Sequence, residues 1–256
     1  MKGPKLNSIE INPTELCNLR CSFCPRSTFY PNRNLNMSLD MARFIRKELD
    51  EAWRVGWRGR VSMTGRGEPT LHPQFDELTE IFARDRKYHL LLTTNGKRLD
   101  QYIEDGTADK YDRIVRNIYE AQQDDANVLK KKYQEYKNID VFWKPDIEGE
   151  TTWENYFYEG MIRGFTNRAG SFEGTTTKGW CDRPWNKMFI DWNGDYKLCC
   201  EDWKHDIVMG NIQTENIHQY YTKNKKLNMF REKLTKGIRD VAPCNECSYC
   251  PHSRVA

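Results

Sequence analysis

The 256-residue sequence predicts an α/β protein, a partial (β/α)5–6 barrel followed by a small C-terminal α+β domain built on a β-hairpin and a helix. Short apolar strands alternate with amphipathic helices as far as residue 165, which indicates a parallel sheet with right-handed crossovers. About five such units are too few to close an eightfold barrel. After residue 180, Asn193-Gly194 separates two alternating runs, which is the strongest short signal for a hairpin.

Periodicity and capping signals predict the individual elements. Leu6–Asn12 alternates apolar and polar residues and ends at Pro13, so it is expected to form a strand. Ser38 is expected to cap a helix that runs to about Val55 with one apolar stripe. Further strands are expected at Arg60–Thr64, His89–Thr93, Asp112–Ile118 and Ile139–Trp143, with a candidate sixth at Met161–Phe165, and further helices at Gln74–Arg84, after Gly96, and at Ala121–Tyr136, Asn216–Thr222 and Lys226–Lys236.

A segment rich in Gly, Thr and Ser, Thr166–Lys178, predicts the domain boundary. We therefore expect a barrel domain over residues 1–168 and a second domain over 169–256. In such folds the loops that follow the strands gather at one mouth, where the chemistry occurs. The loops 13–28, 65–70 and 94–97 each follow a predicted strand, so their side chains are expected to converge.

Composition restricts the class of protein. No run approaches the roughly 18 apolar residues of a membrane helix, and the N-terminus lacks the apolar region of a secretory signal, so we expect a cytoplasmic protein without a membrane partner. The net charge is +3 with neutral cysteines. Seven thiolates and two clusters of about +2 each would bring it to roughly zero, so a nucleic-acid partner is not indicated.

Nine cysteines in such a chain favour metal binding over disulfides. Cys17, Cys21 and Cys24 lie within eight residues, directly after the first predicted strand, and no fourth ligand is near. A closed zinc site needs four ligands. Three thiolates can instead hold three irons of a [4Fe–4S] cluster and leave the fourth iron open to a ligand. A zinc site completed by a distant residue, or three ordinary buried thiols, are the alternatives.

The loop Gly65-Arg66-Gly67-Glu68-Pro69 follows the second predicted strand. Glycines allow the backbone to approach a ligand closely, and a carboxylate among them can accept from an ammonium group. A tight turn with a solvated glutamate is the alternative. Beside an open iron, the loop favours a ligand that carries both an amine and a carboxylate, which is an amino acid or a derivative of one.

The Cys17, Cys21 and Cys24 spacing, with Phe23 before the last cysteine, and Gly67-Glu68-Pro69 together resemble the radical S-adenosylmethionine (SAM) superfamily. The resemblance implies that the methionine part of SAM chelates the open iron. Arg66 stands where the commonest family form, Gly-Gly-Glu-Pro, has its first glycine. By resemblance, Phe23 would lie near the adenine, Gly67 and Glu68 would hold the methionine amine, Thr94 and Asn95 would line the site, and Asn117 would lie near the ribose. Gly65 and Pro69, in the same loop as Gly67 and Glu68, are further candidates for cofactor binding.

A second cysteine group consists of Cys181, Cys199, Cys244 and Cys247. The hairpin would bring the first two together, and four thiolates would close either a zinc site or a cluster. Attached to a radical SAM core, the group resembles the twitch half of the SPASM/twitch extension, which implies one auxiliary [4Fe–4S] cluster.

Two further thiols lie beside these cysteines. Cys200 is expected to point away from the auxiliary cluster as a small buried apolar residue. Cys250 could replace a ligand, stabilise the turn or be free.

The resemblance also implies a mechanism. An electron from a donor such as flavodoxin or ferredoxin would enter the first cluster and cleave SAM to a 5′-deoxyadenosyl radical, which would abstract a substrate hydrogen atom. A small-molecule substrate is favoured and a peptide is an alternative, because no recognition domain precedes residue 8. Arg163 and Arg168 are candidate anchors for a polar or anionic substrate.

Three reactions remain open at this point, and the sequence does not name the substrate. The favoured one is dehydrogenation of an alcohol on a sugar- or aminocyclitol-like molecule, with the auxiliary cluster accepting an electron, since a short chain of this kind resembles the aminocyclitol dehydrogenase type. The second is epimerisation with Cys250 as hydrogen donor, and the third is modification of a ribosomal peptide or another macromolecule. A non-enzymatic cluster-binding module is disfavoured by the Gly67-Glu68-Pro69 loop.

Overall fold

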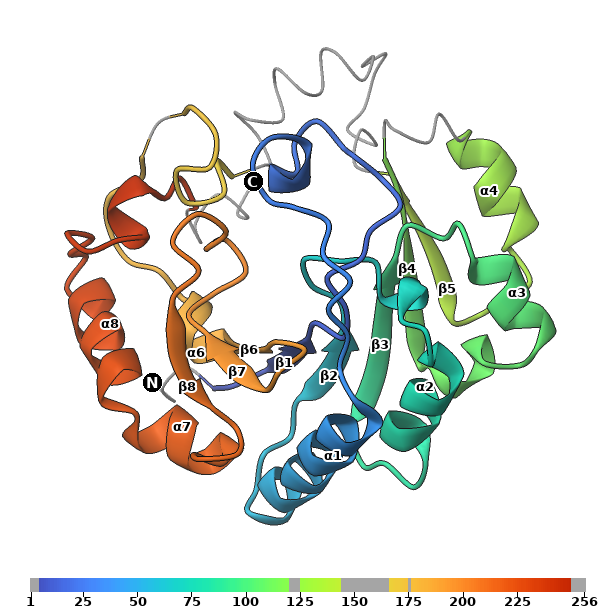
Figure 1. Cartoon of the computed structure of the whole chain (residues 1–256), viewed down its shortest axis with the longest axis horizontal. Helices are drawn as coiled ribbons and strands as arrows, with labels where there is room; N and C mark the ends of the chain where they lie inside the picture. The colour runs from blue at the N-terminus through green and yellow to red at the C-terminus, as the bar shows by residue number, and fades with distance from the viewer. Residues whose placement is uncertain (1–4, 120–124, 144–165, 175, 250–256) are drawn as a thin grey trace.

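An open eight-stranded sheet forms the centre of the protein in the computed structural model, which describes residues 5–119, 125–143, 166–174 and 176–249. The strand order is β5-β4-β3-β2-β1-β6-β7-β8. Neighbouring strands from β5 to β6 are parallel, whereas β6, β7 and β8 pair antiparallel. Figure 1 shows helices α1 to α4 on the outer side of the first strands and α7 and α8 beside the last ones. The sequence-based expectation of a partial, unclosed α/β barrel is confirmed.

The elements lie close to their expected positions. In the first part of the chain they are β1 (Ser8–Ile11), α1 (Leu39–Arg54), β2 (Arg60–Met63), α2 (Phe75–Ala83), β3 (His89–Thr94), α3 (Leu99–Glu104), β4 (Arg113–Ile118), α4 (Ala126–Lys132) and β5 (Ile139–Trp143). In the last part they are α6 (Arg183–Asn186), β6 (Lys187–Ile190), β7 (Asp195–Lys197), β8 (Val208–Asn211), α7 (Ile217–Lys223) and α8 (Lys225–Thr235).

Local chemistry explains why the longest helix starts where it does. The Ser38 hydroxyl accepts a hydrogen bond from the backbone N–H of Met41 at 3.1 Å, which caps α1. Ala42, Ile45 and Leu49 recur at helical spacing and are fully buried. The predicted helix is therefore confirmed together with its cap and its apolar stripe.

The two faces of the sheet differ in chemistry, because successive strand residues point to opposite sides. Ile9, Ile11, Val61 and Met63 point to the outer face and are fully buried in the hydrophobic core. Alternate residues on the same strands are polar and line a cavity on the inner face. The sheet thus supports a helical layer on one side and a polar site on the other.

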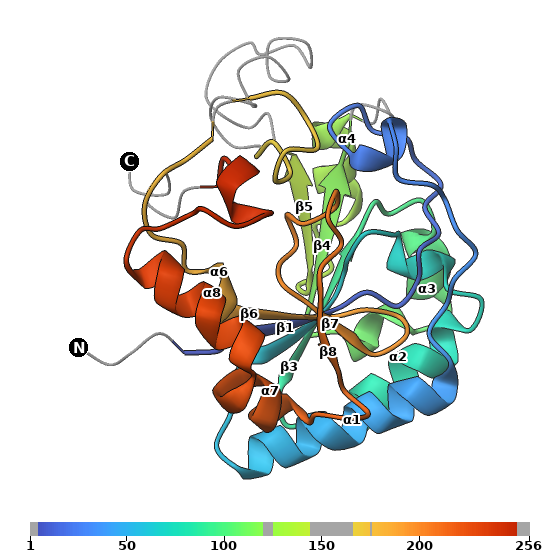
Figure 2. The same cartoon turned by 60° about the vertical axis from the view of Figure 1, so that its left-hand side comes forward.

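The hairpin is confirmed, and it continues the barrel sheet. Gly194 adopts a positive φ of +83° in the turn between β6 and β7, as a hairpin with Asn193-Gly194 requires. Strand β6 pairs in parallel with β1, with Met188 opposite Ile9. Figure 1 shows β1, β6, β7 and β8 in this order, and Figure 2 shows the same strands close together near the centre of the molecule. The domain boundary near residue 168 stays a prediction.

One expectation needs correction, one falls outside the described residues, and one strand was not predicted. The helix expected at Ala121–Tyr136 is shorter, because the Asp125 side chain caps a helix that begins at Ala126 and ends at Lys132. The candidate strand Met161–Phe165 lies outside the described residues. Strand β8, which pairs with β7, was not predicted, because its four residues include Gly210 and show no clear alternation.

Within the described ranges, no helix combines the length and apolar character needed to cross a membrane.

Candidate functional site

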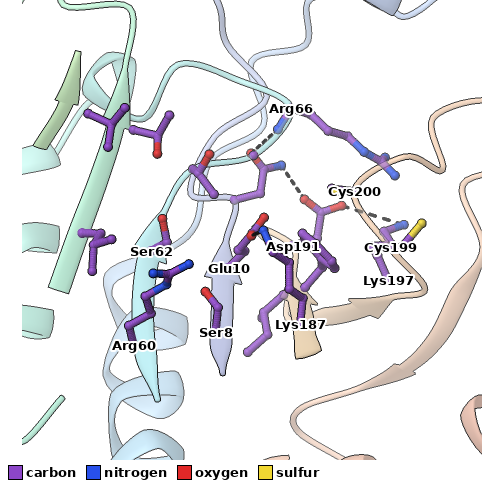
Figure 3. Close-up of a pocket in the computed structure, with 18 of the residues that line it drawn as sticks. Ser8, Glu10, Arg60, Ser62, Arg66, Lys187, Asp191, Lys197, Cys199 and Cys200 are labelled. Atoms are coloured by element: carbon purple, nitrogen blue, oxygen red, sulfur yellow. Dashed lines mark hydrogen bonds and ion pairs between the residues drawn. The ribbon is translucent and has the colours of Figure 1, made fainter. Parts of the chain in front are cut away.

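A polar cavity of about 470 Å³ runs along the inner face of the sheet. Figure 3 shows its walls, with Ser8 and Glu10 on β1, Ser62 on β2 and Lys187 on β6. Cys199 and Cys200 contribute from the opposite side, after β7. The cavity therefore extends from the barrel interior to the second cysteine group. Its mouth residues at or just beyond the carboxyl ends of the strands are Asn12, Thr64, Gly65, Arg66, Asn117, Tyr119 and Asp191, and Arg168 and Trp203 also line the cavity.

The first cysteine loop borders this cavity. Cys21 is 6% exposed and packs with Phe23, whose ring lies 5.5 Å from that of Tyr119, a cavity residue. The backbone N–H of Cys24 donates to the Cys21 carbonyl at 2.9 Å. Burial raises the pKa of the Cys17 thiol, and the nearby Glu68 adds to the effect. Thiolates here need a compensating positive charge, which the irons of a cluster would supply.

The glycine loop passes close to the start of the cysteine loop. A Cβ atom on Gly67 would lie 2.1 Å from the Thr14 carbonyl oxygen, and one on Gly65 would lie 2.3 Å from Asn12 Oδ1. Gly65 also has a φ of +143°, which side chains rarely adopt. The backbone N–H of Glu68 donates to the Leu16 carbonyl at 2.7 Å. Only glycine fits both positions, so the loop is shaped for close backbone approach.

Glu68 is 4% exposed, and its carboxylate accepts hydrogen bonds from other residues of the protein. Its Oε1 accepts from the hydroxyls of Thr70 at 2.7 Å and Thr94 at 2.6 Å, and its Oε2 accepts from the backbone N–H of Asn95 at 2.7 Å. Asn95 in turn donates to Asn18 in the cysteine loop at 2.8 Å. Glu68 therefore joins the glycine loop to the end of β3 and, through Asn95, to the cysteine loop, so that a hydrogen-bonded network holds its carboxylate at the mouth.

The remaining predicted cofactor residues lie at the same mouth. Pro69 is buried and begins a short 3-10 turn, Pro69–Leu71. Asn117 is 8% exposed, lies near the end of β4 and lines the cavity. The strand ends thus bring together the residues predicted to bind the first cluster and SAM. This convergence was expected from the order of strands and loops.

The second cysteine group surrounds one small cavity. Cys181, Cys199, Cys244 and Cys247 all line it, although they come from three separate segments. Burial and neighbouring thiols raise the pKa of Cys199 well above its usual range and that of Cys244 to about 12. Cys199 also lines the large polar cavity, so the two spaces share this residue. Cys250 lies outside the described residues.

The donor set fits an iron–sulfur cluster. None of the eight described cysteines forms a disulfide. Four cysteines line one cavity, and four thiolates are the usual ligand set of a [4Fe–4S] cluster.

Cys200 differs from its expected environment. It is half-buried and lines the large cavity, and its sulfur lies 3.2 Å from Arg183 Nη1 and 3.6 Å from Glu201 Oε1. The expectation assumed a regular strand, but β7 ends at Lys197, so strand alternation no longer fixes its direction. The prediction of an apolar packing residue is therefore wrong.

A buried charge cluster lies beside Cys200. The sequence analysis named only one of its members, Arg168, and missed the others. Glu201 is 3% exposed and forms ion pairs with Arg168 at 3.3 Å and Arg183 at 3.4 Å. Burial alone would raise the pKa of Glu201, but the two guanidinium groups outweigh it and lower the pKa. Arg168 lines the cavity, whereas Arg163 lies outside the described residues. No spacing signal links Glu201 to two arginines that lie far from it in the chain.

Two protein-family models match the chain. The Radical SAM superfamily model matches residues 11–129, and an iron–sulfur cluster-binding domain model, SPASM, matches residues 181–251. The matched ranges contain the first and second cysteine groups, respectively. These matches identify SAM and iron–sulfur clusters as the cofactors.

Similar proteins of known name fall into two groups. A GTP 3',8-cyclase from Actinobacillus succinogenes is 35% identical over 96 residues, which is 37% of this chain and 28% of that enzyme. The chain thus covers less than a third of the length of that relative. The S-adenosyl-L-methionine-dependent 2-deoxy-scyllo-inosamine dehydrogenase of Niallia circulans is 24% identical over 249 residues, covering 94% of this chain and 92% of that one.

Solved structures of similar fold match nearly the whole chain. The crystal structure of BtrN in complex with AdoMet and 2-DOIA has a TM-score of 0.76 at 19% identity and covers 95% of this chain and 93% of that one. BtrN in an open conformation has a TM-score of 0.65 at 20% identity, covering 97% and 94%. The solved structures thus show the fold of the chain, and the two family models show that it carries a radical SAM domain over residues 11–129 and an iron–sulfur cluster-binding domain of the SPASM type over residues 181–251.

Proposed function

We propose that the chain is a radical SAM dehydrogenase that oxidises an alcohol on a small sugar- or aminocyclitol-like molecule. One observation carries the proposal. Cys199 lines both the large polar cavity and the small cavity of the second cysteine group. A substrate in the large cavity would thus lie next to an auxiliary cluster, which is where an electron acceptor is needed.

Two ligand sets follow for the clusters. Cys17, Cys21 and Cys24 would hold the cluster that binds SAM, and Cys181, Cys199, Cys244 and Cys247 would hold the auxiliary cluster. The close backbone approach at Gly65 and Gly67 supports a SAM site beside the first loop. Phe23, Pro69, Thr94, Asn95 and Asn117 would complete that site, with Glu68 holding the loops in place.

The bound cofactors would supply the redox chemistry, taking one hydrogen atom from the carbinol carbon as 5′-deoxyadenosine and one electron into the auxiliary cluster, while the hydroxyl proton leaves to a base. The protein would orient the substrate and exclude water. The electron that starts the reaction would come from a reduced flavodoxin or ferredoxin. The product is a ketone, two electrons more oxidised than the alcohol.

The cavity chemistry supports a small polar substrate. Its walls carry hydroxyls, carboxylates and cations, and Arg168 lies on it beside Glu201. A volume of about 470 Å³ lies within the usual range for small-molecule sites. The dehydrogenase of Niallia circulans, which matches nearly the full length, is named for such a substrate. Peptide modification receives no comparable support from the cavity.

The test is an anaerobic assay of the reconstituted enzyme with SAM, a reductant and a panel of aminocyclitols that includes 2-deoxy-scyllo-inosamine. The proposal predicts one 5′-deoxyadenosine per ketone formed. A substrate deuterated at the carbinol carbon should pass its label to 5′-deoxyadenosine, and no solvent deuterium should enter the product. Consumption of peptides but not of any alcohol in the panel would refute the proposed substrate class.

Cys200 favours epimerisation as a second candidate. Its thiol lines the large cavity, as a hydrogen-atom donor must, whereas Cys250 lies outside the described residues. Epimerisation would require a stereoisomeric product that carries solvent deuterium at the inverted carbon. Replacement of each thiol separately, Cys200→Ala and Cys250→Ala, would then stop turnover in the donor variant only. Dehydrogenation should survive both substitutions.

A further inference from the structure

The Arg66 side chain leaves the glycine loop and reaches the second cysteine-bearing region. Its guanidinium is 10% exposed and donates to the Asp206 carboxylate at 2.6 Å and to the Asp202 carbonyl at 2.7 Å. It also donates to the Tyr30 hydroxyl at 3.0 Å and lies over the rings of Tyr30 and Trp203. A glycine at this position would make none of these contacts.

Arg66 belongs to a closed ring of polar contacts. Its backbone N–H donates to Asn12 Oδ1 at 3.1 Å, and Asn12 Nδ2 donates to Asp191 at 2.6 Å. Asp191 lies 3.8 Å from the Lys197 ammonium, which donates to Asp206 at 2.8 Å, and Asp206 returns to Arg66. Figure 3 shows the part of this ring from Arg66 through Asp191 to Lys197. We call these five residues the Arg66 ring.

The ring joins the two halves of the proposed active site. Asn12 follows β1 and Arg66 follows β2, so both belong to the SAM side. Lys197 ends β7, two residues before Cys199. Asp206 lies on the loop after the tandem cysteines, at a positive φ of +50° that is uncommon for a residue with a side chain. Asp202 orders this loop by accepting from the backbone N–H groups of residues 205, 206 and 207.

The charges of the ring are balanced only when Arg66 is present. Two cations, Arg66 and Lys197, face two carboxylates, Asp191 and Asp206. Lys197 is 9% and Asp191 7% exposed at the side chain, so water screens their charges poorly. Loss of the guanidinium would leave two carboxylates sharing one ammonium group. The loop that carries Cys199 and Cys200 would then be free to move away from the glycine loop.

We propose that the Arg66 ring holds the Cys199 loop in register with the SAM site, and that Arg66 is a positioning residue which couples hydrogen abstraction to electron uptake. The inference rests on the proposed function, because coupling has meaning only if the two clusters serve one substrate. Arg66 departs from the commonest family form, in which a glycine stands at this position and cannot make such a contact. The Arg66 guanidinium acts through its hydrogen bonds to Tyr30, Asp202 and Asp206.

The test compares Asp206→Asn, which keeps the shape of the side chain, with Asp240→Asn as a matched control. Asp240 forms an exposed ion pair with Lys233 in the same half of the chain, outside the ring. In reconstituted holoenzyme, Asp206→Asn should still form 5′-deoxyadenosine. The ratio of 5′-deoxyadenosine to oxidised product should rise about tenfold or more, since an ångström of misplacement can cost ~100-fold. Asp240→Asn should keep the wild-type ratio.

A second readout is independent of turnover. Hydrogen–deuterium exchange of residues 199–206 in the holoenzyme should become faster in Asp206→Asn and Arg66→Gln, but not in Asp240→Asn. Arg66→Lys, which keeps the charge, should restore part of the protection. Unchanged exchange in both ring variants would overturn the proposal, as would faster exchange with an unchanged product ratio. If the wild type oxidises no alcohol but hydrogen exchange responds as expected, the proposed function fails, while the Arg66 ring still holds the Cys199 loop in place.

Discussion

The two cysteine groups are brought together by different parts of folding. Cys17, Cys21 and Cys24 belong to one loop, which follows a single buried strand and needs little else to bring its thiols near one another. The second group is assembled around one cavity from a segment before α6, the end of a hairpin and a turn near the C-terminus. The first site is therefore a local feature placed on the barrel, whereas the second exists only when the C-terminal region has folded.

Because of this difference, loss of the two sites should have different effects on the reaction and on the stability of the fold. Loss of the first site should remove the reaction and leave the fold, because helices and strands of the barrel hold the loop in place. Loss of the second should affect both the reaction and the fold, because the cluster would link three distant segments. Cys199, which borders both cavities, is the structural connection between the two sites.

The largest expected effect is on SAM cleavage. The triple variant Cys17→Ala, Cys21→Ala and Cys24→Ala should form no 5′-deoxyadenosine, because the open iron that would bind SAM is gone. Cys181→Ala should still form 5′-deoxyadenosine but little ketone, because the electron acceptor is missing. Anaerobic assays that quantify both compounds by chromatography would show the contrast. Product formation by the triple variant would contradict the assignment of the two sites.

The second largest expected effect is on the free energy of unfolding. Cys247→Ala should lower the free energy of unfolding by about 2–4 kcal/mol, by analogy with the removal of a covalent link between distant segments. Cys21→Ala should cost less, since its loop closes within eight residues and loop-closure entropy grows with length. Thermal unfolding of the two reconstituted variants under anaerobic conditions makes the comparison. An equal or smaller loss for Cys247→Ala would remove the distinction between a local and an assembled site.

A smaller effect should appear at the glycine loop. Gly67→Ala would place a Cβ 2.1 Å from the Thr14 carbonyl oxygen, so the loop must move by an ångström or more. We expect SAM affinity to fall by about tenfold or more, measured by equilibrium binding to the reconstituted enzyme. Gly106→Ala is the control for a loop glycine without close approach, since the Cβ on Gly106 would meet nothing within 4 Å although its φ is +78°. Equal losses of SAM affinity in the two variants would mean that the close approach at Gly67 does not explain the effect.

The smallest expected effect is on the pH dependence of stability, and it involves only the barrel part of the chain. His72 is 2% exposed, its Nε2 bonds to the Met37 carbonyl at 2.8 Å and its Nδ1 accepts from the Gln74 N–H at 3.1 Å. Burial lowers the pKa of His72 from its ordinary value of 6.5. The unfolded chain therefore takes up a proton below about pH 6.5, while the folded chain stays neutral until its lower pKa is reached. The resulting stability is complete above pH 6.5 and is lost as the pH falls towards the folded pKa.

Unfolding of wild type and His72→Gln between pH 7.5 and 5.5 would test this expectation. The wild type should lose up to about 1.4 kcal/mol per pH unit relative to the variant, because glutamine does not titrate. Parallel pH profiles would show that His72 does not carry the effect.

The sequence predicted the parts of the site that depend on neighbouring residues. The Cys17–Cys24 spacing, the Ser38 cap and the Asn193-Gly194 turn are local patterns, and each lies where it was expected. The convergence of the strand-end loops followed from the parallel order of the sheet. Four cysteines from three segments around one cavity agree with the predicted auxiliary group, whose role as ligands stays a prediction.

Contacts between residues distant in the chain could not be predicted. The Glu68 carboxylate accepts hydrogen bonds from Thr94, the last residue of β3, and from Asn95, and no sequence pattern linked these residues. Arg66 was noted only as a departure from a glycine pair, because nothing in the sequence links it to Asp206. Cys200 does not line the cavity of the second cysteine group, as expected, but the apolar packing predicted for it is wrong, because its sulfur lies 3.2 Å from Arg183, which is 17 residues away.

The most direct test of the account is an iron and sulfide count on anaerobically reconstituted protein. About eight irons and eight sulfides per chain are expected for the wild type, from two [4Fe–4S] clusters. The triple variant at Cys17, Cys21 and Cys24, and separately Cys199→Ala, should each keep only about four of each, with distinct EPR spectra for the remaining cluster. Zinc without sulfide at the second site, or only about four irons in the wild type, would contradict the account.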